Sequence, residues 1–169
     1  ILKQDTVYVL NALYEIFGID TRKKSAFSLT EKTAPFREIF SFLEDNDTLW
    51  VAGTEAFGRI VGGRLQYFNS PLLSNNFIVG IERFPHSDSV LLFSKSGILY
   101  YSGGQIGKVA NTVWPWGGKI NNAFRESDSS ILAFVDGHGI YRIINSGGLK
   151  FKPVLTNENS TYDFKNVFG

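Results

Sequence analysis

The sequence predicts an all-β fold assembled from a repeated unit of four antiparallel strands, and three observations support this. Two short apolar strands around a Gly-containing turn recur from Leu49, Val90 and Ile131, which lie about 41 residues apart. The chain holds 15 Phe, 7 Tyr and 17 Gly residues, a mixture that suits strands joined by tight turns. A glycine pair, suited to a hairpin, follows each recurrence: Gly62-Gly63, Gly103-Gly104 and Gly147-Gly148.

The N-terminal segment is expected to be the back end of one such unit. β-Branched and aromatic residues dominate 6–10 and 12–17, which favours two strands joined by a turn at Asn11. Residues 25–29 can supply one more strand. The apolar spacing within 10–17 also fits a helix, and we prefer strands because the segment is short and lies in the register of the repeat.

The first complete unit is expected over 35–70. The acidic turn 44–47 joins its first two strands, because Asn and Asp side chains bond readily to their own backbone. Pro71 marks the connection to the next unit. The expected strands of this unit are 38–43, 48–52, 57–61 and 64–68.

Two further units repeat this plan, each with a polar turn after its first strand and a glycine pair before its last. The tail 162–169 is expected to open one more unit. The expected strands are 77–84, 90–94, 98–101 and 105–109 in the second unit, and 120–125, 131–135, 139–144 and 149–154 in the third.

These units predict a single partial β-propeller. A four-stranded blade cannot bury both of its faces alone, so it must stack on neighbours around an axis. Because neither end of the chain is a blade boundary, we expect a fragment of a seven- or eight-bladed ring. The expected divisions are a blade remnant at 1–34, blades at 35–74, 75–116 and 117–156, and the start of a further blade at 157–169.

Composition excludes several classes of function. A formal net charge of +1 gives no reason to expect a nucleic-acid partner, which needs a concentrated basic patch. The absence of Cys excludes disulfides, thiolate metal sites and a Cys nucleophile. No apolar run approaches the roughly 20 residues of a membrane helix, and no signal peptide is visible. Because the chain lacks Met, we expect a piece of something larger.

Residues 49–60 resemble a known repeat, that of the two-component regulator propellers. Leu49-Trp50-Val51, Gly53-Thr54, Phe57 and Arg59-Ile60 follow its pattern of Leu-Trp-(Ile/Val)-Gly-Thr, a short spacer, Gly-Leu, any residue and Arg/Tyr. The segment 40–45 is similar to the apolar strand ending in Glu-Asp that precedes that pattern. The resemblance covers roughly 36–154.

The later units follow that pattern less closely. They keep Gly97-Ile98 and Gly139-Ile140 but lack its Trp and Thr, and the first unit carries an extra Ala52 and has Ala56 in place of Gly. The resemblance implies a non-catalytic, periplasmic sensor module of a membrane-anchored bacterial signalling protein. It also implies a helical linker, a cytoplasmic histidine kinase or diguanylate cyclase, and homodimers of the parent. No cofactor is expected.

A ligand site is expected where the connections between units emerge beside the turns between second and third strands. The ligand would be a small molecule that the sequence does not identify, for example a saccharide or a peptide. Trp114 and Trp116 could stack on it, or could instead pack between blades. The Asn residues could donate hydrogen bonds to it, or could simply cap turns. The candidate binding residues are Trp114, Trp116, Asn76, Asn121, Arg37, Lys95 and His138.

No catalytic or metal site is expected from the motifs. Asp45-Asn46-Asp47 lacks the Gly and bidentate Glu of a calcium loop. His86 and His138 have no metal-ligand spacing, and there is no Gly-x-Ser-x-Gly motif. Two other function classes stay open. A propeller lyase or glycosidase would need carboxylates such as Glu55, Asp136 and Glu158 to converge, and an interaction scaffold would show an exposed apolar patch without a pocket.

Overall fold

The structure, a computed structural model, describes residues 2–3, 5–11, 13, 15–29, 38–46, 48–84, 87–109, 119–161 and 164. Within these residues the chain forms four antiparallel sheets of four strands each, and in each sheet the strands lie in the order of the sequence. This confirms the predicted all-β fold of repeated four-stranded units.

The strand bounds follow the repeat closely. The first sheet holds β1 (Leu2–Lys3), β2 (Thr6–Leu10), β3 (Ile16–Asp20) and β4 (Ser25–Ser28). The second holds β5 (Ile39–Asp45), β6 (Thr48–Gly53), β7 (Ala56–Val61) and β8 (Arg64–Tyr67). The third holds β9 (Ile78–Glu82), β10 (Val90–Ser94), β11 (Gly97–Ser102) and β12 (Gln105–Lys108). The fourth holds β13 (Ile120–Ser127), β14 (Ser130–Val135), β15 (Gly139–Asn145) and β16 (Leu149–Thr156), and a 3₁₀ turn, η1 (Pro71–Leu73), precedes β9.

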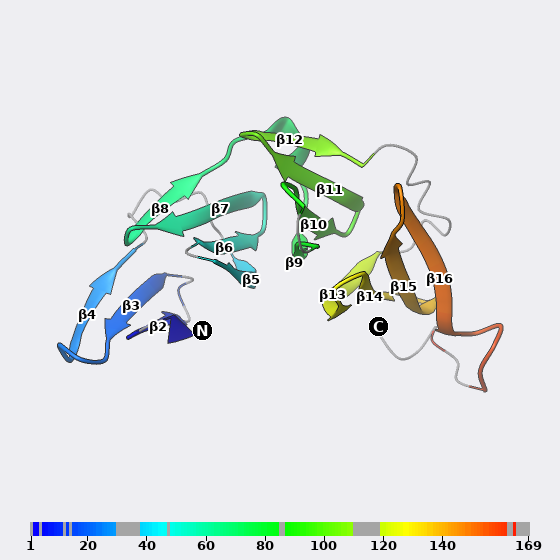
Figure 1. Ribbon diagram of the computed structural model, residues 1–169, viewed down its shortest axis with the longest axis horizontal. Helices are drawn as coiled ribbons and strands as arrows, with labels where there is room; N and C mark the ends of the chain where they lie inside the picture. Colours follow the sequence, from blue (N-terminus) through cyan, green and yellow to red (C-terminus); the bar gives the residue numbers. More distant parts are fainter. Residues whose placement is uncertain are drawn as a thin grey trace.

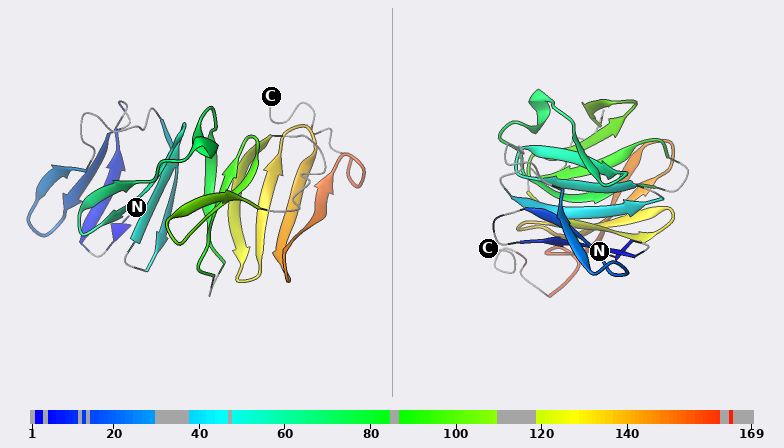
Figure 2. Two further views of the ribbon diagram at one scale, coloured as in Figure 1. Left: turned by 90° about the horizontal axis from the view of Figure 1, so that it is seen from above. Right: turned by 90° about the vertical axis from the view of Figure 1, so that its left-hand side faces the viewer.

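The sheets fan out along an open arc (Figure 1). The first strand of each sheet lies on the inner side of the arc and the last strand on its outer side. The inner strands contact one another from sheet to sheet, β5 with β9 and β9 with β13. In the left view of Figure 2, the four sheets lie side by side in one row. This is the arrangement of successive propeller blades.

Apolar side chains fill each junction between neighbouring sheets. Between the second and third sheets, Trp50 stacks on Phe57 with ring centroids 5.4 Å apart, and Tyr101 packs against both. Burying each such ring is worth about 1.5–3 kcal/mol. The first junction is built on Ile16, Leu49, Val51 and Ile60, and the third on Phe93, Ile98, Ile131, Ala133 and Ile143.

The outer faces of the two end sheets are apolar as well. On β2 and β3, Val9 and Ile19 point away from the second sheet and are exposed. On the fourth sheet Phe124 is 41 % exposed and packs against Phe134, with the two ring planes tilted by 34°. The two interior sheets pack against a neighbour on both faces. The end sheets also carry apolar residues on both faces, as a propeller blade does.

The glycine pairs take the backbone conformations expected of hairpin turns. All six residues have positive φ, between 55° at Gly62 and 135° at Gly148. L-residues with a Cβ rarely adopt these values. The prediction that these pairs form hairpins is confirmed because each links two antiparallel strands.

The first sheet differs from the prediction in two ways. It has a fourth strand, β1, whose two residues are too few to leave a pattern in the sequence. The second difference is that the strand expected within 12–17 starts at Ile16 and continues through Gly18 to Asp20. A Cβ at Gly18 would come within 2.3 Å of the Phe27 ring, so the ring lies directly over this glycine and the strand continues beneath it.

The helical alternative for 10–17 is excluded for the residues described there. The Asn11 side chain accepts hydrogen bonds from the backbone N–H groups of Leu13 and Glu15, both at 2.9 Å, which closes a turn. The expected turn at Asn11 is therefore confirmed. The tail predicted as a further strand, 162–169, lies outside the described residues except for Phe164. None of the helical segments described is long and apolar enough to cross a membrane.

Candidate functional site

Three turns with one hydrogen-bonding pattern lie along one side of the row of sheets, at the top in the left view of Figure 2. In each of the last three sheets, the turn between the second and third strands donates a backbone N–H to the segment that enters the sheet. The donors Thr54, Lys95 and Asp136 are spaced by the repeat, and their bonds to the carbonyls of Glu38, Phe77 and Lys119 measure 2.9, 3.2 and 2.8 Å. We call this side of the row of sheets, with η1 and the adjoining connections, the loop face.

Asn76 is the best-connected of the predicted binding residues that the structure describes. It is 8 % exposed. Its side-chain amide donates to the Leu72 carbonyl at 3.1 Å and accepts from the Ser96 hydroxyl at 2.9 Å. Its backbone carbonyl accepts from the Glu55 N–H at 2.8 Å. Asn76 therefore ties the connection between two sheets to a turn of each.

The other predicted binding residues are spread over two sheets. Lys95 is exposed beside Asn76, with its ammonium 4.6 Å from the centroid of the Phe77 ring. His138 and Asn121 are half-buried in the fourth sheet, His138 in the turn before β15 and Asn121 on β13. Trp114, Trp116 and Arg37 lie outside the described residues. The structure therefore brings Asn76 and Lys95 close together, because Asn76 bonds to Ser96 and Lys95 lies over the ring of Phe77.

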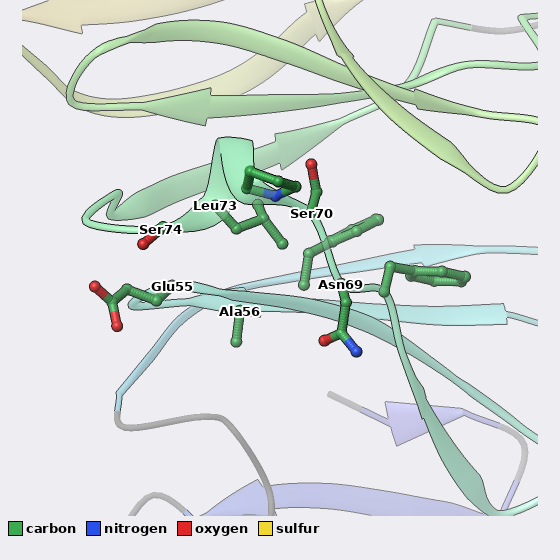
Figure 3. A pocket seen from close by; sticks show the side chains of 9 residues that line it. Glu55, Ala56, Asn69, Ser70, Leu73 and Ser74 are labelled. Carbon is green, nitrogen blue, oxygen red and sulfur yellow. The ribbon is translucent and has the colours of Figure 1, made fainter.

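A recess of about 350 Å³ opens on the loop face between the start of β7 and η1. Figure 3 shows side chains from the 54–57 turn on one side and from the connection 68–74 on the other. Sequence reasoning missed this site as a whole. Its lining consists of Glu55, Ala56, Phe57, Phe68, Asn69, Ser70, Pro71, Leu73 and Ser74, and we call it the Glu55 recess.

The backbone around Glu55 holds its side chain in place. Glu55 has a φ of +58°, and Asn75, opposite it, has a φ of +57°. The Asn75 N–H donates to Oε1 of Glu55 at 2.8 Å. Ser70 caps η1, since its hydroxyl accepts from the Leu72 N–H at 3.2 Å. The Ser-Pro pair at the start of η1 is a sequence feature that predicts a turn. The positive φ of Glu55 could not be predicted, because Glu rarely adopts this conformation.

A second recess occupies the corresponding corner of the fourth sheet. It has a volume of about 180 Å³ and is lined by His138, Tyr141, Pro153, Thr156, Asn157 and Glu158. Burial, with a further contribution from the negative charge of Glu158, raises the pKa of Tyr141. The Asn157 amide donates to the Gly137 carbonyl at 3.0 Å, so here too the outgoing connection is tied to the turn.

The carboxylates that an enzyme would need are distributed between these sites. Glu55 lines one recess and Glu158 the other, while Asp136 lines neither. Acid–base catalysis by two carboxylates requires both at one substrate. Among the described residues, no group of three or more His, Asp or Glu side chains could hold a metal ion.

Comparison with solved structures places this architecture among known folds. The chain is similar to the extracellular domain of BT4673 of B. thetaiotaomicron, described as a candidate one-component or hybrid two-component system. The TM-score is 0.74, the sequence identity 16–17 % in two structures, and the match covers 98 % of this chain and 23 % of that one. PorZ, a surface component of the type-IX secretion system of Porphyromonas gingivalis, matches with TM-score 0.66 and 9 % identity over 86 % of this chain and 20 % of PorZ.

A second B. thetaiotaomicron protein, the extracellular domain of the candidate hybrid two-component system BT3049, matches with TM-score 0.59 and 12 % identity, over 92 % of this chain and 23 % of that one. No family model matches the chain, and no curated protein does. The chain thus spans about a quarter of the length of the B. thetaiotaomicron domains. These likenesses show the fold and agree with the resemblance to two-component regulator propeller repeats: the chain is a segment of a β-propeller.

Proposed function

We propose that this chain is part of the extracytoplasmic sensor propeller of a bacterial two-component signalling protein, and that the segment itself is non-catalytic. The observation that supports this most is the match of nearly the whole chain, 98 %, to the extracellular domain of a candidate hybrid two-component system. The repeat in residues 49–60 supports the same class independently of that match.

The loop face supports a sensing role in physical terms. Asn76 joins the connection after the second sheet to turns of the second and third sheets, and Glu55 binds that same connection. A small molecule that binds here changes the relative stability of two arrangements of neighbouring blades, and a partner domain can read such a shift. The proposal extends to a membrane-anchored, dimeric parent with a cytoplasmic histidine kinase or diguanylate cyclase.

Two experiments in the organism that encodes the chain test this proposal. The first inserts β-lactamase in frame after Thr156 of the full-length gene. Enzyme that is active in intact cells is expected for an extracytoplasmic segment. Resistance no higher than that of a cytoplasmic fusion, with equal protein levels, would contradict the proposed location.

The second experiment deletes the codons for 35–156 from the chromosomal gene and compares transcript profiles across a panel of growth substrates. We expect at least one substrate-dependent response of the wild type to be lost. Profiles that are identical on every substrate on which the wild-type protein is produced would contradict a sensor role.

A further inference from the structure

The Glu55 recess combines an apolar body with a single charge. Glu55 is the one charged residue in its lining, and no Lys or Arg lines it. Its neutral polar groups are those of Asn69, Ser70 and Ser74, and five apolar residues complete the wall: Ala56, Phe57, Phe68, Pro71 and Leu73. An anion would meet an uncompensated carboxylate here, which disfavours anionic ligands.

The Glu55 carboxylate is held in position and retains acceptor capacity. Oε1 accepts from the Asn75 N–H, and the backbone N–H of Glu55 is bound by the Asn76 carbonyl. An ionised carboxylate has about four acceptor positions, and among the described residues Oε2 has no partner. Figure 3 shows this carboxylate at the rim of the recess, on the same side as Ser74. Because the backbone fixes the acceptor, little side-chain entropy is lost when a donor binds.

The aromatic rings of the recess are not available as a stacking platform. Phe57 is fully buried. The Phe68 ring packs on Tyr101 at a centroid distance of 4.3 Å, and the Arg59 guanidinium lies 5.6 Å from its centroid. The recess therefore offers apolar walls and an anionic rim, but no free ring face for a flat ligand.

We propose that the Glu55 recess binds a primary ammonium group carried on a compact apolar body. The ammonium would donate to Oε2 of Glu55, while the apolar body would fill the space between Leu73, Pro71 and Phe68. A charge-assisted hydrogen bond of this kind is roughly twice as strong as a neutral one. The volume of about 350 Å³ lies at the lower end of the range of small-molecule sites, which suits a ligand of this size.

This inference rests on the proposed function in that it names a ligand class for the sensor. The same chemistry occurs in free small amines and in the Lys side chain of a peptide. The recess of the fourth sheet is half the size and has the imidazole of His138 as well as a carboxylate in its lining, so it does not offer the same site.

Isothermal titration calorimetry at pH 7 and low salt tests the proposal. The probes are isopentylamine, 3-methylbutan-1-ol and 4-methylpentanoate, which share a compact aliphatic body and differ in charge, and a peptide Ala-Lys-Ala with blocked ends represents the second source. We expect the amine to bind about 10-fold or more tightly than the alcohol, equivalent to one charge-assisted bond, and the carboxylate to show no binding. Stronger binding of the blocked peptide than of isopentylamine would assign the natural source to peptides, and the reverse order to free amines.

Three variants locate the binding. Glu55→Gln removes the charge but keeps an acceptor for Asn75, and should weaken amine binding about 10-fold. Ser74→Trp should fill the recess and abolish binding, since Ser74 is exposed and extended (φ −61°, ψ 132°) and tolerates a large side chain. Asp88→Asn, in the β9–β10 turn, makes the same change of charge away from the recess and should leave binding unchanged.

Equal affinity for amine and alcohol, or wild-type affinity in Glu55→Gln and Ser74→Trp, would overturn the inference. So would an absence of amine binding to the correctly folded wild-type protein. None of these results touches the reporter or deletion experiments, so failure of the ligand class and failure of the sensor role can be distinguished.

Discussion

Asp45, at the end of β5, forms an ion pair with Arg83, which directly follows β9 in the neighbouring sheet. Both side chains are about three-quarters buried, with 20 % and 25 % of their surfaces exposed. At the next junction, Glu82 accepts from the backbone N–H of Arg125 at 2.9 Å. An ion pair and a hydrogen bond therefore join successive inner strands on the side of the sheets opposite the loop face.

Removing the Asp45 carboxylate should loosen the second and third sheets. In Asp45→Ala, Arg83 would keep its bond to the Ser87 carbonyl but lose its counter-ion. For a pair that is neither fully exposed nor fully buried, we expect a loss of about 1–2 kcal/mol in the free energy of unfolding. Urea denaturation measures it, with the exposed Asp88→Ala as the control. An Asp45→Ala protein no less stable than this control would show that the pair contributes nothing.

Glu82 gives the protein a characteristic pH dependence. Burial raises the pKa of this carboxyl group in the folded state, and the Arg125 N–H and charge only partly offset it. A raised folded pKa means that the contribution of Glu82 is most favourable below the unfolded value of 4.5 and is lost as the pH rises through the folded pKa.

Glu82→Gln should therefore become more stable relative to the wild type as the pH rises from 4 to 7, because Gln keeps the acceptor for Arg125 without a buried charge. Thermal melts at several pH values measure this difference. A difference in melting temperature that stays constant over that interval, or that shrinks, would contradict the raised pKa.

Asn76→Ala should destabilise the loop face in particular. The substitution leaves the Leu72 carbonyl and the Ser96 hydroxyl without their buried partner, at a cost of about 1–3 kcal/mol. We expect faster amide hydrogen exchange at residues 53–55 and 94–97, with little change in β14 and β15. Uniform acceleration over all sheets would argue against a local role, as would exchange unchanged from the wild type.

Two glycines of the fourth sheet provide a matched pair of substitutions. Gly139 has a φ of +119°, and a Cβ there would lie 2.2 Å from the Leu155 carbonyl oxygen. Gly147 has a φ of +71° with nothing within 4 Å. Gly139→Ala should cost several kcal/mol, since the backbone of β16 must move, and Gly147→Ala about 1 kcal/mol for the strained φ. Equal melting temperatures would contradict the close approach of β15 and β16.

The features of the fold that the sequence predicts are those set by single residues and their immediate neighbours. Gly62-Gly63 and its repeats mark hairpins, since few residues other than glycine adopt positive φ twice in succession. Leu49, Val90 and Ile131 mark the second strands because each is buried between sheets. The path of β3 could not be read, because it depends on Phe27, a residue of the adjacent strand, covering Gly18.

The Glu55 recess could not be read for a similar reason. Its two sides, around Glu55 and Ser70, meet through the bonds of Asn75 and Asn76, and none of these is predictable from residue type alone. Asn76 lies on the loop face, where its amide is engaged by Leu72 and Ser96. Contacts between segments that lie apart in the sequence therefore determine which side chains of this face stay accessible, and residue types alone do not show them.

Chemical cross-linking tests most directly the claim that consecutive four-stranded sheets stand side by side around one axis. The chain has no natural Cys, so a pair of engineered cysteines can be read without background. With a short bis-maleimide and mass spectrometry, Asp45→Cys with Arg83→Cys should cross-link within one molecule, whereas Asp45→Cys with Asp128→Cys, two sheets apart, should not. Cross-linking of the second pair and not of the first would contradict the propeller arrangement.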